Sequence, residues 1–193
     1  QKKAVTHIDG PLLIVAGAGS GKTRVLTSRI ANLIKEKKAF PNQILAVTFT
    51  NKAAKEMQKR VSTILKTDAN GLPWLGTFHS ICAKLLRRHA TAVNLKSNFT
   101  IIDTDDQSRL IKNICKSEDI DTKQLSPKFI LSIIDKWKNR GFYPNDVILK
   151  TKETFEKNIL SLYKIYQQKL IDLNSCDFGY LILHTVKVFE KNN

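Results

Sequence analysis

Short apolar runs and helical stripes alternate along the first half of the chain. Each run is bounded by turn residues and is typical of a buried strand, and the runs are Leu12–Val15, Ile44–Phe49 and part of Leu72–Phe78. Between and after them, apolar positions recur at helical spacing from Lys22 to about Ile34, from Thr50 or Asn51 to about Lys66, and from about His79 to Arg88. Strands that alternate with helices predict an α/β fold built on a parallel sheet.

The pattern changes near residue 97, where longer helical stripes begin. Phe99–Asp103 is briefly strand-like, and a capping box formed by Thr104 and Gln107 then opens a helix. We expect further helices from Ser126-Pro127 to Gly141, from about Lys152 to Asp172, and from about Asp177 onward. The inward stripe of the last helix is predicted to be Phe178, Leu181, Ile182, Val186 and Phe189. The second half is therefore predicted to be all-helical.

Net charge also separates the two halves. The chain carries 32 basic and 17 acidic side chains, a formal charge of +15. Residues 1–97 hold 17 of the basic and 4 of the acidic side chains, whereas residues 98–193 hold 15 and 13. A basic surface attracts polyanions, so nucleic acid is the leading candidate partner, and a purely solubilising charge is the alternative. In the near-neutral second half, a local patch for duplex contact would come from Lys136, Lys138 and Arg140.

The segment after the first apolar run predicts a phosphate-binding loop. Glycine occupies every second position from Gly17 to Gly21, and Lys22 and Thr23 follow at the start of a helix. Glycines let the backbone fold tightly around an anion, and the N–H groups of a helix N-terminus attract phosphate. Lys22 would bridge the β- and γ-phosphates of a nucleotide, and the Thr23 hydroxyl would ligate Mg²⁺. Ala16 stands where the usual pattern has glycine, and the alternative interpretation is a glycine-rich turn beside a solvated lysine.

Aromatic and polar residues follow the next two apolar runs. Phe49, Thr50 and Asn51 end the second run, and Thr77–His79 repeats the arrangement after the third. Ligands of open α/β sheets bind beyond the carboxyl ends of strands, so both clusters are expected on the rim that also holds the nucleotide. An aromatic ring for base stacking and small polar groups for phosphate oxygens favour single-stranded nucleic acid. Each cluster alone is also compatible with a capped helix start and a core phenylalanine.

Three segments in this order and spacing resemble motifs of the superfamily 1 DNA helicases of the UvrD/PcrA/Rep type. They are Ala16–Arg24, Ala46–Ala54 with Glu56-Met57, and Gly76–Ser80. Phe99–Asp103 looks like the start of that family's helical 1B subdomain, and Asp177-Phe178 looks like its return into 1A. The resemblance implies an incomplete RecA-like P-loop NTPase sheet with an all-helical subdomain. It divides the chain into an ATP-binding motor subdomain 1A (1–97), subdomain 1B (98–176) and a helix returning toward 1A (177–193).

The resemblance also implies roles for individual residues. Lys22 and Thr23 would be the catalytic phosphate and Mg²⁺ ligands, and Gln1 would read adenine. The remaining ATP contacts would come from the loop residues Ala16, Gly17, Ala18, Gly19, Ser20, Gly21 and Arg24. Single-stranded DNA would contact Phe49, Thr50 and Asn51 in the first motif and Thr77 and His79 in the second. The family uses ATP hydrolysis to translocate 3′→5′ and unwind duplex at single-strand/duplex junctions, typically with partners in DNA repair or replication.

Hydrolysis needs groups that these motifs do not supply, namely an acidic pair for Mg²⁺ and water and an arginine for the developing charge. By the resemblance, the acidic strand would begin beyond Asn193. Asp103 imitates the end of such a strand, but the capping box beside it favours a helix-opening residue. We therefore expect an N-terminal helicase fragment that binds ATP weakly and hydrolyses little or none. The alternatives are another P-loop enzyme, such as a small-molecule kinase, and a non-enzymatic nucleic-acid-binding module.

The three cysteines, Cys82, Cys115 and Cys176, are far apart and show no C-x-x-C spacing. They are expected to be small core residues in a reducing cytoplasm rather than metal ligands or disulfides. No apolar run reaches about 18 residues, so no membrane partner is expected.

Overall fold

A computed structural model gives the fold of the chain and describes residues 1–66, 71–120, 125–149 and 154–191. Its contacts divide the chain into two compact units, Gln1–Ile81 and Cys82–Asn193. The division falls inside helix α4 (Phe78–His89), before the change of pattern that the sequence shows near residue 97. The assignment of residues 1–97, 98–176 and 177–193 to three subdomains stays a prediction.

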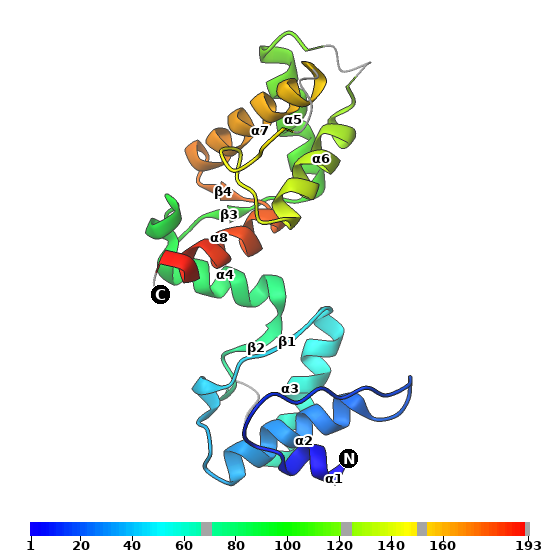
Figure 1. Ribbon diagram of the computed structural model, residues 1–193. Coiled ribbons are helices and arrows are strands. Elements are labelled where there is room, and N and C mark those ends of the chain that lie inside the picture. The colour runs from blue at the N-terminus through cyan, green and yellow to red at the C-terminus, as the bar shows by residue number, and fades with distance from the viewer. Residues whose placement is uncertain (67–70, 121–124, 150–153, 192–193) are drawn as a thin grey trace. The chain divides into compact units, whose positions relative to one another are not determined.

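The first unit is a small α/β arrangement (Figure 1). Its elements are α1 (Lys2–Thr6), α2 (Lys22–Lys35), the 3-10 turn η1 (Pro41–Gln43), β1 (Ala46–Thr48), α3 (Asn51–Leu65) and β2 (Leu75–Thr77). β1 and β2 pair in parallel, with Val47 opposite Gly76, and α3 is the crossover between them. Parallel strands require such a crossover, so the predicted alternation of strands and helices in a parallel sheet is confirmed. β1 is shorter than the predicted strand Ile44–Phe49, whereas β2 lies within Leu72–Phe78, where a short strand is predicted.

Local sequence explains where the helices of this unit begin. The Thr50 side chain accepts a hydrogen bond from the backbone N–H of Ala53 at 3.2 Å and so caps α3. Gly21 precedes α2 with a φ of +85°, a conformation that favours glycine. α2 and α3 pack against each other, and the core between them and the strands consists of Ile30, Ala46, Met57, Val61, Leu72 and Leu75.

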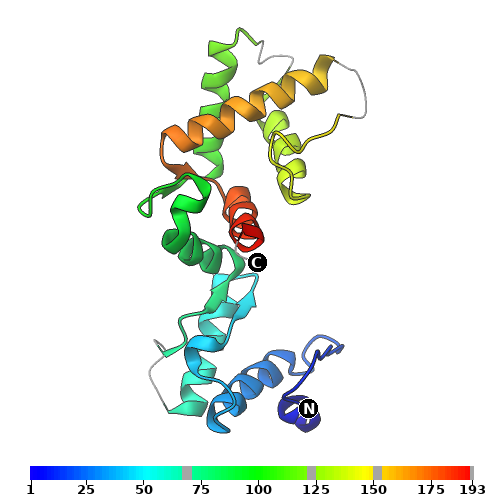
Figure 2. The ribbon, with the colours of Figure 1, turned by 60° about the vertical axis from the view of Figure 1, so that its left-hand side comes forward.

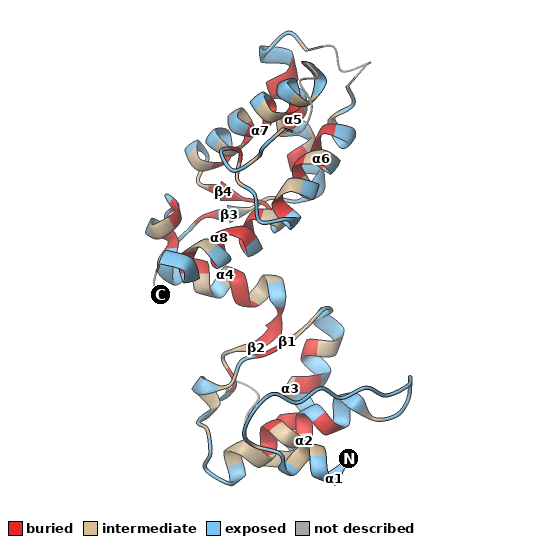
Figure 3. Ribbon diagram, in the orientation of Figure 1, coloured by how far each residue is buried: buried red, intermediate tan, exposed pale blue. Residues whose placement is uncertain are grey.

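The prediction of a first buried strand at Leu12–Val15 is wrong, because the structure has no strand there. The segment is extended but belongs to neither two-stranded sheet, and Leu13 and Val15 expose 87% and 86% of their surface. Figure 3 shows the whole segment in the colour of exposed residues. An apolar run becomes a buried strand only where a neighbouring strand pairs with it and another layer covers it. No strand among the described residues pairs with this one.

The second unit is mainly helical. After α4 it contains the 3-10 turn η3 (Ala90–Val93), β3 (Thr100–Ile101), α5 (Thr104–Ser117), α6 (Pro127–Asn139), α7 (Thr154–Asp172), β4 (Ser175–Cys176) and α8 (Phe178–Lys191). α5, α6 and α7 pack against one another (Figure 1 and Figure 2). The strand-like segment near Phe99 is confirmed as β3, which pairs in parallel with the unpredicted β4. The helical character of the second half is otherwise as predicted.

Two helix starts in this unit show how closely the sequence determines local structure. The Asp103 carboxylate accepts the N–H groups of Asp105 and Asp106, both at 2.9 Å, so Asp103 rather than Thr104 caps α5. One oxygen of the Asp103 carboxylate accepts both N–H groups, and the interpretation of Asp103 as a helix-opening residue is confirmed. Ser126 caps α6 as predicted, accepting the N–H of Phe129 at 3.3 Å.

The core of the second unit is larger than that of the first, and it corrects one predicted stripe. On α8 the buried side chains are Tyr180, Leu181, Leu183, His184, Thr185 and Val188, whereas Phe178, Ile182, Val186 and Phe189 are exposed. Apolar residues surround most of this helix, so periodicity alone did not select the correct face. The cysteines follow the prediction, because all three are buried and free of disulfides.

Candidate nucleotide and nucleic-acid site

The predicted phosphate loop lies between the extended segment and the start of α2. Gly19 has a φ of +74° and Gly21 one of +85°, which are left-handed conformations that disfavour other residues. The Ser20 hydroxyl donates to the carbonyl of Gly17 at 2.6 Å and so closes the turn. The backbone angles therefore require glycine at positions 19 and 21. At Gly17 no positive φ is found and a Cβ would meet no atom within 4 Å, so glycine is not required there.

Lys22 is folded back onto this loop. Its ammonium donates to the carbonyl oxygens of Ala16 and Gly17, each at 2.6 Å. These carbonyls hold the positive charge at the mouth of the loop, beside the N-terminus of α2. The first backbone hydrogen bond of that helix runs from Val25 N–H to the Gly21 carbonyl, which leaves the N–H groups before Val25 without a helical acceptor. Together they form an arrangement suited to an anion such as a phosphate.

Gln1 lies at the same loop, although the sequence places it far from Ser20. Its side-chain amide donates to the Ser20 carbonyl at 2.9 Å. Arg29 of α2 holds α1 in place, since its guanidinium donates to the carbonyl of Ala4 within that helix at 3.0 Å and to the carbonyl of Ile8 after it at 3.4 Å. The structure therefore brings together Gln1 and the residues from Ala16 to Arg24, and the role of Gln1 toward adenine stays a prediction.

Thr23 is the residue available for a metal ion at this loop. It is exposed at the first turn of α2, directly after Lys22. No group of three His, Cys, Asp or Glu side chains gathers as a metal site within the described ranges. A hydroxyl and phosphate oxygens are ligands that Mg²⁺ accepts, so the residues present fit a metal that arrives with the nucleotide.

The second candidate surface forms where β1 and β2 end. Thr48 lies opposite Thr77 in the parallel register, so the residues after them emerge together. The rings of Phe49 and Phe78 are 5.5 Å apart and tilted by 44°, and Phe49 exposes 90% of its surface. We call these two residues the aromatic pair. Two adjacent exposed rings at a strand end can stack on unpaired bases.

Some of the polar residues around the aromatic pair also stabilise the starts of α3 and α4. Thr50 caps α3, and Asn51 is exposed as its first residue. Thr77 is buried, and its hydroxyl accepts the N–H of Ser80 at 3.2 Å, so it shapes the start of α4. His79 follows Phe78 in the first turn of that helix. The structure thus places all five predicted DNA-binding residues at one end of the β1–β2 sheet.

The sequence analysis did not name Phe78 as a candidate site residue. The signal was present, because an aromatic residue follows each strand, but Phe78 was equally compatible with a core position. The parallel register brings it beside Phe49, where it is exposed, and this adds it to the candidate surface.

The predicted basic patch of the second half is wrong in its central member. The Lys138 side chain is fully buried and forms an ion pair with Asp177. Its ammonium also lies 4.0 Å from the ring centroid of Tyr180 and 4.9 Å from that of Tyr166. A lysine held by a carboxylate and aromatic rings is part of the core and is not accessible to duplex DNA.

Among the described residues no helix is long and apolar enough to cross a membrane.

Comparison with known proteins adds an independent finding. The family model described as the UvrD/REP helicase N-terminal domain matches residues 1–193. DNA helicase II of Rickettsia typhi is 48% identical over 196 aligned residues, which cover 100% of this chain and 29% of that protein. The ATP-dependent DNA helicase PcrA of Bacillus subtilis is 45% identical over 191 residues, covering 99% of this chain and 26% of the relative.

A further relative is the ATP-dependent DNA helicase PcrA of Staphylococcus epidermidis, which is 46% identical over 191 residues. The match again covers 99% of this chain and 26% of the relative. The chain therefore spans less than a third of the length of these relatives.

Proposed function

Because the chain belongs to the UvrD/REP helicase N-terminal domain family, we propose that it is the part of a DNA helicase that binds ATP and single-stranded DNA. Its relatives are DNA helicases, and its fold is the incomplete RecA-like P-loop α/β fold of that domain. Family membership argues against the two alternatives, a small-molecule kinase and a non-enzymatic nucleic-acid-binding module.

The observation that carries the nucleotide half of the proposal is the loop at the start of α2. N–H groups without helical acceptors, a positive helix end and the Lys22 ammonium converge there. In this proposal Lys22 exchanges its two carbonyl acceptors for the β- and γ-phosphate oxygens of ATP, and Thr23 provides a hydroxyl ligand for Mg²⁺. When bound, Mg²⁺ neutralises charge on the phosphates. The loop contributes binding and orientation, and Gln1 would read the adenine ring beside it.

The nucleic-acid half of the proposal depends on the aromatic pair. Phe49 and Phe78 offer ring surface to bases, and Asn51 and His79 lie next to them in the chain. The excess of basic residues in the first half of the sequence supplies attraction to phosphates without sequence readout. For the whole protein we propose 3′→5′ translocation, unwinding at junctions and a role in repair or replication, as the resemblance to the UvrD/PcrA/Rep-type helicases implies.

We further propose that this chain alone hydrolyses ATP little or not at all. Within the described residues no group of three or more His, Cys, Asp or Glu side chains gathers as a metal site, and the motifs at the phosphate loop do not supply the acidic pair that positions Mg²⁺ and water. We also propose that the protein works in the reducing cytoplasm, where three free, buried cysteines would stay reduced.

Binding of a fluorescent ATP analogue tests the nucleotide half. Lys22→Ala is expected to weaken binding by about tenfold or more, because it removes a charge-assisted contact to phosphate. Lys35→Ala is the matched control, since it removes the same charge from the other end of α2. Equal affinities of the Lys22→Ala variant and the parent chain would refute the nucleotide site.

Binding of a labelled oligothymidylate tests the nucleic-acid half. Phe49→Ala is expected to weaken binding by about tenfold, since stacking of one base on an aromatic ring contributes roughly 1–3 kcal/mol. Phe40→Ala is the control, because Phe40 is an exposed ring of the same unit that precedes η1. Loss of binding in both variants, or in neither, would contradict a role for the strand ends.

A further inference from the structure

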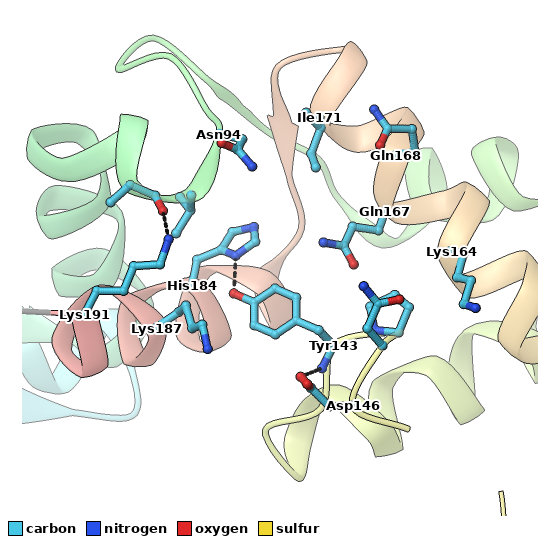
Figure 4. A pocket seen from close by; sticks show the side chains of 14 residues that line it. Asn94, Tyr143, Asp146, Lys164, Gln167, Gln168, Ile171, His184, Lys187 and Lys191 are labelled. Carbon is cyan, nitrogen blue, oxygen red and sulfur yellow. Dashed lines mark hydrogen bonds between the residues drawn. The ribbon is translucent and has the colours of Figure 1, made fainter. Parts of the chain in front are cut away.

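The helical unit contains a pocket that the proposed function does not use. Its volume is about 480 Å³, within the range of small-molecule sites. Four segments line it, namely residues 92–94, residues 143–146, one face of α7 and one face of α8 (Figure 4). All lining residues belong to Cys82–Asn193, whereas every residue of the proposed ATP and DNA sites belongs to Gln1–Ile81.

The central group of this pocket is His184, which exposes only 5% of its surface. Its Nδ1 lies 2.7 Å from the hydroxyl oxygen of Tyr143. The imidazole lies against the ring of Tyr180 at a centroid distance of 4.7 Å, and the ring of Tyr143 lies 5.6 Å away, with its hydroxyl at the edge that carries Nδ1. The edge that carries Nε2 points toward Asn94 and Gln167, which also line the pocket (Figure 4).

The hydrogen bond between the Tyr143 hydroxyl and Nδ1 is compatible with either ring nitrogen carrying the proton. We assign the hydroxyl as the donor, which places the imidazole proton on Nε2, the nitrogen that faces the pocket. Burial lowers the pKa of His184 to about 4, which keeps the ring neutral near pH 7. His184 therefore presents a fixed N–H donor to the pocket at neutral pH.

The charged groups around the pocket are mostly positive. Lys164, Lys187 and Lys191 line it, against one carboxylate, that of Asp146. The Asp146 carboxylate accepts a hydrogen bond from the backbone N–H of Tyr143 at 3.0 Å. The Lys191 ammonium donates to the backbone carbonyl of Ala92 at 2.8 Å. Lys187 makes an exposed contact of 3.4 Å with Glu190. Lys164 has no ion pair within the described part of the chain, so its charge is available to a ligand.

From these groups we propose that the pocket binds a small phosphate monoester, such as a nucleoside monophosphate. The N–H of His184, the side-chain amides of Asn94 and Gln167, and the ammonium groups of Lys164 and Lys187 are all donors, and phosphate oxygens are strong acceptors. A free phosphate ion would fill only a small part of the volume, whereas the ester leaves an organic part for the amide-lined remainder. The proposal concerns a second site and does not rest on the proposed ATP site.

NMR of the histidine rings tests the proposal, because the chain has 4 histidines and one of them lies in the pocket. The chain carries Lys22→Ala to suppress binding at the phosphate loop, and the His184 signal is assigned by its loss in His184→Gln. Titration with AMP is expected to shift the His184 signal and to leave those of His7, His79 and His89 in place. Inorganic phosphate is expected to act only at higher concentration, and adenosine not at all.

The same titration in two lysine variants locates the phosphate. Lys164→Gln is expected to weaken AMP binding by about tenfold, since it removes a charged donor. Lys157→Gln removes the same charge from the same helix outside the pocket and is expected to leave binding unchanged. Both residues are exposed, so neither change disturbs the core.

Three outcomes would overturn the proposal. They are a His184 signal that stays in place with AMP, equal affinities for AMP and inorganic phosphate, and an AMP affinity unaffected by Lys164→Gln. Because the Lys22→Ala background already lacks the loop lysine, none of these outcomes bears on the ATP site.

Discussion

Removal of the buried charge of Lys138 gives the sharpest test of how the helical unit is held together. Lys138→Met keeps the aliphatic stem among the rings but leaves the Asp177 carboxylate buried without its cation. The carboxylate keeps two hydrogen bonds, from the Tyr166 hydroxyl and from the backbone N–H of Tyr180, both at 2.8 Å. An uncompensated buried charge costs about 3–5 kcal/mol of unfolding free energy. Because two hydrogen bonds to the carboxylate are retained, we expect a loss of about 3 kcal/mol, at the lower end of this range.

The double variant Lys138→Met/Asp177→Asn separates the cost of a lone charge from the value of the pair. The amide that replaces the Asp177 carboxylate would still accept the N–H of Tyr180 through its carbonyl oxygen, and no buried charge would remain. Replacing both members of a buried pair with neutral groups is often close to neutral in free energy. We therefore expect the double variant to regain about 2 kcal/mol relative to Lys138→Met, a coupling typical of residues in contact.

Urea denaturation followed by tryptophan fluorescence measures these differences. The chain has 2 tryptophans, Trp74 in the first unit and Trp137 in the second, so Trp74→Phe leaves a reporter of the helical unit alone. Arg109→Met is the control, because it breaks an exposed pair with Asp106 of the same unit and is expected to cost at most about 0.5 kcal/mol. A loss below about 1 kcal/mol for Lys138→Met, with an unchanged m-value, would refute the reasoning.

Three further predictions follow from individual contacts. Burial lowers the pKa of His184 to about 4, below its unfolded value, so the folded state binds fewer protons and stability falls as pH drops through 6.5 to 4. Between pH 7.5 and 5 this group is expected to cost about 2 kcal/mol, measured as the difference in urea denaturation between the parent chain and His184→Gln. In Gly179→Ala the new Cβ would lie 2.9 Å from Cδ of the buried Lys138, and the expected loss of about 1–3 kcal/mol is measured by the same assay. Phe78→Ala is expected to weaken oligothymidylate binding about as much as Phe49→Ala, because the two rings are adjacent.

Each of these predictions has a control and a contrary result. For His184, burial raises the pKa of the Asp135 carboxyl and so opposes the trend, which is why the comparison is between variants at each pH. Parallel pH curves would disprove the effect of His184. Gly71→Ala introduces a Cβ with no neighbour within 4 Å, and a loss equal to that of Gly179→Ala would contradict the steric argument. Undiminished DNA binding by Phe78→Ala would remove that ring from the site.

Local chemistry was readable from the sequence, because it depends on residues close together in the chain. The glycine spacing predicted the loop before Lys22, and the backbone angles of Gly19 and Gly21 show why glycine is needed there. The caps at Thr50 and Ser126 were predicted from single side chains that reach an N–H three residues on. Three motifs in register also predicted the family that the comparisons show.

Features that depend on distant partners were not readable in the same way. Leu12–Val15 has the composition of a buried strand, but pairing requires a neighbour that composition does not provide. Lys138 looked like one member of a basic patch, because its partner Asp177 lies on another part of the chain. Periodicity marked α8 as a helix and chose the wrong face, since apolar residues surround most of it.

The sequence by itself therefore determined the fold class, the glycine loop before Lys22, the approximate positions of the helices and the family. Only the tertiary structure decided that Phe78 lies beside Phe49, that Gln1 reaches Ser20, and that His184 lines a pocket with Tyr143. The physical reason is the range of the interactions. Backbone angles and helix caps depend on neighbours within a few residues, whereas burial, ion pairing and pocket formation depend on segments that meet only after the chain has folded.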